Sequence, residues 1–144
     1  MIREMPMMIR PLAAAAALAL ALLAAPALAQ TPGPAAPPQP MFKGGKYVMQ
    51  DGEAIFTHLC QGCHMPDAKG ATGAGTYPAL AGDPRLAAKQ YPIMVIVKGQ
   101  KGMPPFGAYF DDAQVASVVN YVRSHFGNHF AGEATAADVA AMRR

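Results

Sequence analysis

Several residue patterns are missing from this chain or nearly so. Lysine and arginine form no block and no stripe interleaved with aromatic residues, and only 15% of the residues are charged; this argues against nucleic acid as a partner. Strand-like alternation of apolar and polar residues is also absent, which favours an all-α fold. Cysteine is scarce, with two in 144 residues. Any crosslink is therefore one disulfide or one group that uses both thiols.

Residues 1–29 have the layout of a secretory signal peptide. Arg3 and Arg10 give a basic start, residues 12–25 form an Ala/Leu run, and residues 27–29 match the small-residue cleavage pattern. The apolar run is shorter than the roughly 20 residues of a membrane-spanning helix. We predict cleavage after Ala29 and export to the periplasm. An uncleaved membrane anchor is the alternative.

The remaining chain divides into three segments. Half of the residues from 31 to 40 are proline, which predicts an extended Pro-rich tether over residues 30–45. Residues 46–128 are expected to form the folded domain. A C-terminal tail follows over residues 129–144, in which Thr135 can cap one short helix. A domain of this size buries a limited share of its surface and usually needs a crosslink or a cofactor.

Both cysteines fall in one motif, Cys60–Gln61–Gly62–Cys63–His64. In an exported protein this C-x-x-C-H pattern is typical of a c-type haem attachment site. Two thiols three positions apart on a helical turn can form thioethers with the two vinyl groups of one haem, and the next residue can direct its imidazole to the iron. The motif predicts one covalent haem c, held by Cys60 and Cys63, with His64 as an iron ligand.

Two other chemistries use a C-x-x-C pair. A thioredoxin-type dithiol needs a preceding strand and a βαβ pattern, but residues 51–59 have the apolar spacing of a helix. A structural zinc site normally needs four ligands, and only three further histidines remain to complete one: His58, His125 and His129. Haem attachment is the favoured interpretation.

The second axial position of the iron has a leading candidate in Met103. A c-type haem can use methionine there, because the soft thioether favours iron(II) and raises the potential. Met103 lies in a loop rich in glycine and proline, residues 98–107, where it has no helical face to fill and where two prolines stiffen the backbone. A methionine that only packs over an apolar patch is the alternative.

The other possible ligands fit structural roles better. Met65 follows His64 directly and is tied to the same face of the haem. Met94 lies in an apolar run, residues 91–97, that predicts a buried helix. The remaining candidates are Met142 in the tail and, for bis-histidine ligation, His58, His125 and His129.

Short helices and loops account for the rest of the chain. Asp111 and Gln114 form a capping-box pattern that opens a helix. Four valines follow at helical spacing, and Gly127 is expected to end the helix as its C′ residue. The Asp-Pro pair at 83–84 marks another helix start. The segment 69–79, rich in glycine, alanine and threonine, is expected to be a loop.

Together these features resemble the monohaem class I cytochromes c, over roughly residues 49–128. The pieces that carry the resemblance are the C-x-x-C-H motif, the Tyr77–Gly82 loop, the Gly102–Phe106 loop and the final helix. The resemblance implies a small all-α fold of short helices wrapped around one covalent haem.

The resemblance also assigns individual site residues. It implies that His64 and Met103 are the axial pair, and that the Pro78 carbonyl accepts the proton on the second nitrogen of His64 and fixes the ring orientation. Many members have glycine where Tyr77 stands, so a different local turn is expected there.

The final helix, residues 111–124, and the tail segment 135–139 are similar to those of cytochrome subunits of bacterial periplasmic dehydrogenases. This similarity implies a one-electron carrier, not an enzyme, that takes electrons from a substrate dehydrogenase and passes them to the respiratory chain. The alternative is a haem enzyme or a gas or ligand sensor with an open sixth iron site. An exported dithiol oxidoreductase is a lesser alternative.

Overall fold

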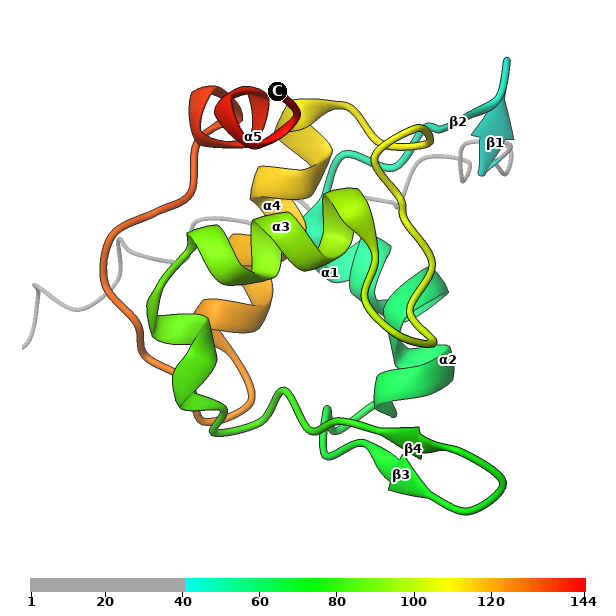
Figure 1. Cartoon of the computed structure of the whole chain (residues 1–144), viewed down its shortest axis with the longest axis vertical. Helices are drawn as coiled ribbons and strands as arrows, with labels where there is room; N and C mark the ends of the chain where they lie inside the picture. The colour runs from blue at the N-terminus through cyan, green and yellow to red at the C-terminus, as the bar shows by residue number, and fades with distance from the viewer. Residues whose placement is uncertain (1–40) are drawn as a thin grey trace, which may run out of the picture. The chain divides into compact units, whose positions relative to one another are not determined.

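The computed structural model describes residues 41–144, so the predicted signal peptide (1–29) and most of the tether (30–45) lie outside the described residues. The elements are, in order, β1 (Phe42–Lys43), β2 (Lys46–Tyr47), α1 (Gly52–Ile55), η1 (Phe56–Cys60), α2 (Gln61–His64), β3 (Ala71–Thr72), β4 (Thr76–Tyr77), η2 (Pro84–Ala87), α3 (Gln90–Lys98), α4 (Asp112–Ser124) and α5 (Ala136–Met142) (Figure 1). Of these, η1 is a π-helix and η2 a 3₁₀-helix. None of the described helices is long and apolar enough to cross a membrane.

A continuous helical run of α1, η1 and α2, the attachment helix, carries the C-x-x-C-H motif. Asp51 caps its start by accepting a hydrogen bond from the Ala54 N–H at 2.9 Å, and the run ends where Met65 turns to a φ of 67°. Ile55 and Phe56 are buried in the core. The middle turn, η1, is widened to a π-helix, which the apolar spacing of the sequence does not predict.

The helix α4 has the predicted capping box. Asp111 accepts a hydrogen bond from the N–H of Gln114, and the Gln114 side chain accepts one from the N–H of Asp111. Its four valines are buried, as their spacing predicted. The expected end at Gly127 is wrong by a few residues: α4 ends at Ser124, and Phe126 as well as Gly127 has a positive φ. The Phe126 ring packs on Phe56, with centroids 4.7 Å apart, and holds this turn in place.

The helices α1 and α4 cross at close range. At Gly52 an added Cβ would lie 2.8 Å from the Ser117 carbonyl carbon and 2.9 Å from the Tyr121 Cβ. The rings of Phe56 and Tyr121 pack beside this contact, with centroids 5.7 Å apart. Glycine at this position therefore lets the two helices approach each other closely.

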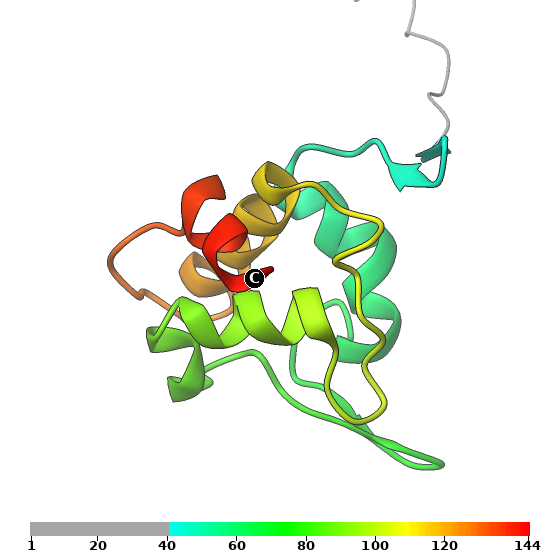
Figure 2. The same cartoon turned by 45° about the horizontal axis from the view of Figure 1, so that its top comes forward.

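The C-terminal tail contributes to the same core. Thr135 and Asp138 form a capping box at the start of α5, and Ala134 and Val139 are buried. At the beginning of α3, Lys89 forms an ion pair with Asp138 at 2.8 Å. The helix α5 packs on α3 and α4, close to both in the views of Figures 1 and 2.

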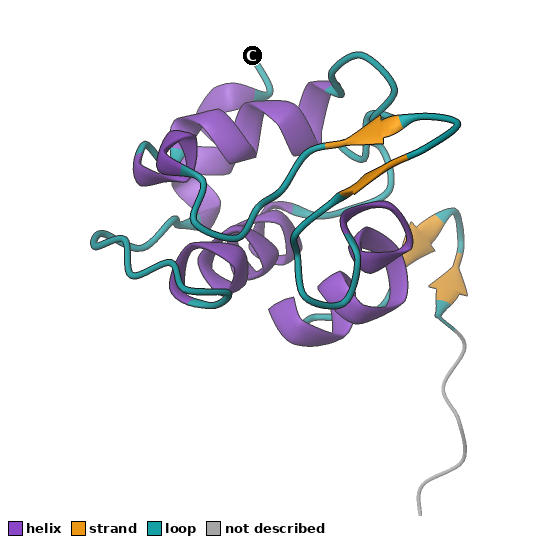
Figure 3. Cartoon of the chain, turned by 90° about the horizontal axis from the view of Figure 1, so that it is seen from below, coloured by secondary structure: helices purple, strands orange, loops and turns teal. Residues whose placement is uncertain are grey.

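Two short antiparallel hairpins accompany the helices (Figure 3). Phe42 lies opposite Tyr47 in the first, and Ala71 opposite Tyr77 in the second. The second hairpin lies in the segment 69–79, which was expected to be a loop. Its strands are two residues long and lack an alternating pattern, so periodicity could not reveal them. The predicted all-α class is confirmed, because the buried core comes from helices and the loops between them.

Candidate haem site

A cavity of about 490 Å³ lies between the attachment helix, α3, α4 and the loop that follows α3. All five predicted site residues line it: Cys60, Cys63, His64, Pro78 and Met103. The rest of its wall is mainly apolar and includes Leu59, Leu80, Leu86, Val95, Ile96, Phe106, Val118 and Val122. A mostly apolar, concave site with a few polar groups is the usual form of a cofactor pocket.

Cys60 and Cys63 lie where η1 meets α2, and no disulfide joins them. Burial, and to a smaller extent the neighbouring Cys63, raises the pKa of the Cys60 thiol to about 12. A reactive dithiol needs the opposite, a lowered thiol pKa. The environment of Cys60 therefore does not favour the thioredoxin-type alternative.

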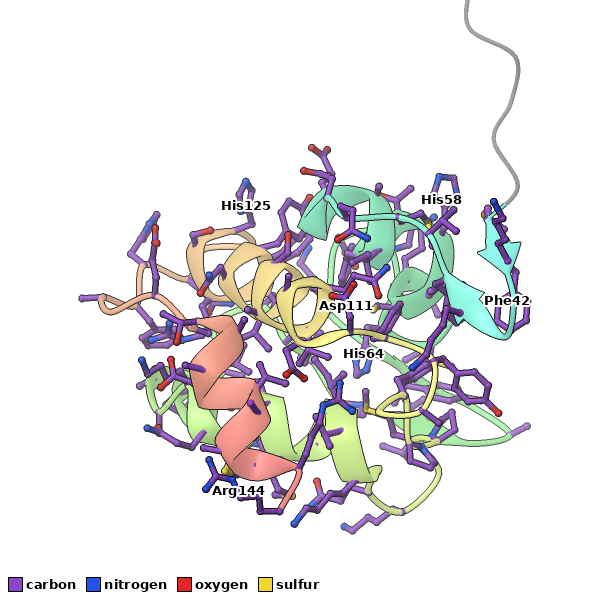
Figure 4. The ribbon with its side chains drawn as sticks, turned by 90° about the horizontal axis from the view of Figure 1, so that it is seen from above. Phe42, His58, His64, Asp111, His125 and Arg144 are labelled. Atoms are coloured by element: carbon purple, nitrogen blue, oxygen red, sulfur yellow. The ribbon has the colours of Figure 1, made fainter. Side chains whose placement is uncertain are left out.

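His64 is almost buried, with 8% of its surface exposed. It lies toward the centre of the molecule in Figure 4, whereas His58 and His125 lie at the outer surface. Its Nδ1 is 2.9 Å from the Pro78 carbonyl oxygen. Because a carbonyl oxygen can only accept, Nδ1 carries the proton and Nε2 keeps the lone pair that an iron ligand needs.

Gly70 brings Pro78 to this position. Its N–H donates to the His64 carbonyl at 3.0 Å, and its φ is +68°. An added Cβ would overlap the Tyr77 carbonyl oxygen and lie 2.7 Å from the Pro78 carbonyl carbon. Only glycine therefore lets the chain turn here and pass so close to the Tyr77–Pro78 peptide.

Met103 lies in the loop between α3 and α4 and is half-buried against the core. The loop leaves α3 at Gly99, which has a φ of +74°. Gln100 and Met103 exchange two backbone hydrogen bonds of 3.0 and 2.9 Å, and Phe106 donates its N–H to the Ile96 carbonyl at 2.8 Å. Figure 2 shows this loop on the same side of the molecule as α1 and α2. The methionine thus comes from a loop that is bonded both to itself and to α3.

The other candidate ligands lie elsewhere. Within residues 41–144, His64 is the one histidine and Met103 the one methionine that line the cavity. Met65 stands in the turn after α2, Met94 on α3, and Met142 packs from α5 against the core. Three histidines are exposed: His58, His125 and His129. Across the described part of the chain, no three Cys, His, Asp or Glu side chains gather as a metal site.

A polar network on the cavity wall is not apparent from the sequence. Arg85 donates to the Tyr91 hydroxyl at 3.3 Å, and Tyr91 donates to the Gln100 side-chain oxygen at 3.3 Å. Asp83 lies beside them and pairs with Arg85 at 2.8 Å. All four line the cavity. These four residues belong to three segments that are separate in the sequence and meet only in the fold. The Asp-Pro pair at 83–84 predicts a helix start but does not predict this network.

These side chains fit a haem. The wall is mainly apolar, as the binding of a macrocycle requires, and the two thiols suit its vinyl groups. Arg85, Tyr91 and Gln100 offer hydrogen-bond donors for its two carboxylates. His64 provides a nitrogen lone pair and Met103 a thioether sulfur, which is the His/Met donor pair of cytochromes c.

Comparison with known families agrees with this chemistry. The family described as "Cytochrome C oxidase, cbb3-type, subunit III" matches residues 48–122, more than half of the 144-residue chain. The chain belongs to this cytochrome c family. The predicted resemblance to class I cytochromes c is confirmed, and so are the small helical fold and the covalent haem c that go with it.

Three relatives have similar sequences. They are the gluconate 2-dehydrogenase cytochrome c subunit of Pantoea cypripedii, 32% identical over 107 residues; the alcohol dehydrogenase (quinone) cytochrome c subunit of Gluconacetobacter polyoxogenes, 29% over 116 residues; and the fructose dehydrogenase cytochrome subunit of Gluconobacter japonicus, 33% over 94 residues. The matches cover 66%, 72% and 54% of this chain. They cover 24%, 24% and 19% of the relatives, so the cytochrome spans about a quarter of their length or less.

Proposed function

We propose that this cytochrome is a periplasmic one-electron carrier that receives electrons from a substrate-oxidising dehydrogenase and passes them to the respiratory chain. The relatives are named as cytochrome subunits of gluconate, alcohol and fructose dehydrogenases, which supports an electron-transfer role. The signal-peptide pattern of residues 1–29 supports a periplasmic location. In this proposal substrate is oxidised on the partner and not on this chain.

One observation carries the proposal: a single cavity is lined by Cys60, Cys63 and His64 from the attachment helix and by Met103 from the loop after α3. We assign the two cysteines to the thioether bonds, and His64 and Met103 to the iron. The haem supplies a one-electron iron(III)/iron(II) couple. His64 presents a nitrogen that the Pro78 carbonyl orients, and the Met103 thioether favours iron(II) and raises the potential.

The position of Met103 favours a carrier over a haem enzyme or a gas sensor. A sulfur at the sixth position blocks small ligands and leaves outer-sphere electron transfer as the available chemistry. An open sixth position would require Met103 to pack away from the cavity. Met103 lies on the cavity wall instead, and within residues 41–144 the cavity is lined by no other methionine and by no histidine except His64. The sensor alternative has no observation in its favour.

The first experiment tests covalent attachment. Acidified acetone should not extract the haem, and the mass of the purified protein should equal the peptide plus one haem. Cys60→Ala and Cys63→Ala should each lose most of the holoprotein, because the small domain then lacks its cofactor core. An extractable haem, or two titratable thiols in the holoprotein, would contradict this assignment.

The second experiment tests the sixth ligand. The oxidised protein should show the weak near-infrared band of sulfur-to-iron charge transfer, and the reduced protein should not bind carbon monoxide readily. Met103→Ala should abolish the band, lower the potential and admit carbon monoxide. Met94→Ala, a half-buried methionine on α3 away from the cavity, is the matched control. Loss of the band in the Met94 variant alone would assign the ligand to α3 instead.

The third experiment tests the partner. The cytochrome should be isolated from its native host by gentle solubilisation, and the proteins that travel with it identified. A dehydrogenase that reduces the haem when given its substrate is the expected result. If the cytochrome travels alone and no dehydrogenase in the extract reduces it, the proposed electron donor is wrong.

A further inference from the structure

The tail beyond residue 128 lies outside the residues 48–122 that the family matches, yet it is fastened to the domain at both ends. Near its start it is bonded to α4 and to Lys89 at the beginning of α3. At its end it is held by Arg143. This last contact bears on the cavity, because the partners of Arg143 include the methionine loop (residues 99–111), which carries Met103.

The guanidinium of Arg143 joins three groups. Its Nη2 donates to the Phe110 carbonyl at 2.9 Å, its Nη1 donates to the Gly107 carbonyl, and its Nε donates to the Asp112 carboxylate. Gly107 and Phe110 lie in the closing part of the methionine loop, and Asp112 is the first residue of α4. The side chains of Arg143 and Asp112 are 29% and 32% exposed, and of the three bonds the one to the Phe110 carbonyl is partly buried, where water competes less than at an open surface. Figure 4 shows the chain ending at the labelled Arg144, just beyond α5.

A stiff segment connects this contact to Met103. Pro104 and Pro105 fix two successive φ angles. The N–H groups of Phe106 and Gly107 then donate to carbonyls of α3 at 2.8 and 3.2 Å. A displacement at Gly107 is therefore transmitted along the loop. The closing part of the loop is held by α3 on one side and by Arg143 on the other; between them the Tyr47 N–H donates to the Tyr109 carbonyl at 3.1 Å and the Phe110 ring is buried in the core.

We propose that Arg143 is a positioning residue for Met103: its guanidinium clamps the closing end of the methionine loop to α4 and so holds the Met103 sulfur in the cavity. This inference rests on the assignment of Met103 as the sixth ligand in the proposed function. Without the clamp the loop loses its side-chain bonds at Gly107 and Phe110, and the open form, in which the sulfur has left the iron, becomes more populated.

The population of the open form can be measured with imidazole. Imidazole binds the oxidised iron only when Met103 has left, so its apparent affinity is proportional to the fraction of open protein. In the oxidised full-length holoprotein, Arg143→Ala removes two hydrogen bonds to the loop. It should therefore raise the apparent imidazole affinity about tenfold. Arg143→Lys, which can reach one carbonyl but not both, should have an intermediate affinity.

Two control variants separate the clamp from general loosening. Arg144→Ala removes the neighbouring exposed arginine and should leave the imidazole affinity unchanged. Lys89→Met releases the beginning of α5 from α3 without touching the methionine loop. It should lower the guanidinium chloride midpoint, followed by far-ultraviolet circular dichroism, and leave the imidazole affinity close to that of the parent protein.

The results separate this inference from the proposed function. If the parent protein shows the near-infrared band and Arg143→Ala binds imidazole no more tightly, the clamp is wrong and the ligand assignment stands. If Lys89→Met raises the imidazole affinity as much as Arg143→Ala does, docking of α5 as a whole is responsible and the clamp is again wrong. If the parent lacks the band, the ligand assignment fails and the clamp fails with it. If Arg143→Ala yields no holoprotein, the Arg143→Lys variant decides: parent affinity overturns the clamp, and a raised affinity supports it.

Discussion

His64 and Pro78, 14 positions apart in the chain, are joined by a hydrogen bond of 2.9 Å from the ring Nδ1 to the carbonyl oxygen. The bond fixes the tautomer and makes the opposite nitrogen more basic. A more basic ligand stabilises iron(III) relative to iron(II), so the bond lowers the potential. Gly70 controls the position of the carbonyl, because it packs directly on the Tyr77–Pro78 peptide.

Gly70→Ala is expected to weaken this bond. The new Cβ would displace the Pro78 carbonyl, and the φ of +68° would strain alanine, so the midpoint potential should rise and the free energy of unfolding should fall by about 2 kcal/mol. Redox titration and guanidinium unfolding measure the two effects. Gly73→Ala, in the same hairpin with nothing within 4 Å of its Cβ, is the control. Lower stability at an unchanged potential would mean that the bond does not tune the iron.

The features that the sequence predicts are those with local signals. The Asp111/Gln114 pair indicates the start of α4 because both members of a capping box stand three positions apart. The attachment motif is equally local, since five adjacent residues contain the whole pattern. Met103 was singled out because its loop is rich in glycine and proline, and its role as a ligand stays a prediction. The role of Pro78 came from a family resemblance alone.

The features that the sequence does not predict depend on contacts between distant segments. Arg143 lies 31 positions from Asp112 and 36 from Gly107, and nothing in the tail sequence points to either partner. The Arg85–Tyr91–Gln100 network likewise forms only when η2, α3 and the following loop surround the cavity. The second hairpin and the π-helical turn are too short to have a periodicity of their own.

The ion pair of Lys89 and Asp138 predicts an acid-sensitive attachment of α5. Hydrogen bonds from Lys89, and then from Thr135, lower the pKa of Asp138 to about 2. The unfolded-state pKa is about 3.9, so the stabilising contribution is fully present well above pH 4 and is lost as the pH falls toward 2. Asp138→Asn should have a lower thermal midpoint than the parent at pH 6, and the difference should shrink as the pH falls below 4 and become small near pH 2.

Thermal unfolding followed by circular dichroism at a series of pH values measures this effect. Glu133→Gln changes an exposed carboxylate close to the same pair and should follow the parent curve at every pH. A constant difference between Asp138→Asn and the parent from pH 6 to pH 2 would show that the carboxylate acts through packing and not through its charge.

Asp83 and Arg85 are expected to shift the potential in opposite directions. Both line the cavity and neutralise each other through a 2.8 Å ion pair. Asp83→Asn leaves a positive charge beside the haem, which disfavours iron(III) and raises the potential; Arg85→Gln leaves a negative charge and lowers it. Asparagine can still cap η2. The double variant should return close to the parent value, and redox titration of all four proteins forms a double-mutant cycle. Shifts of the same sign in both single variants would contradict this electrostatic account.

Gly52→Ala tests the close crossing of α1 and α4. Helix propensity alone would make alanine more favourable than glycine by up to about 1 kcal/mol. The new Cβ would, however, lie 2.8 Å from the Ser117 carbonyl carbon, which is a backbone atom and cannot rotate away. Overpacking of this kind typically costs about 1–3 kcal/mol, and because the overlap is with backbone the variant should be less stable than the parent. The guanidinium unfolding midpoint, followed by circular dichroism, measures the change.

Glu53→Ala, an exposed change in the same helical turn, controls for altered propensity. If Gly52→Ala unfolds at a higher midpoint than the parent, propensity dominates and the two helices are not in contact at this glycine.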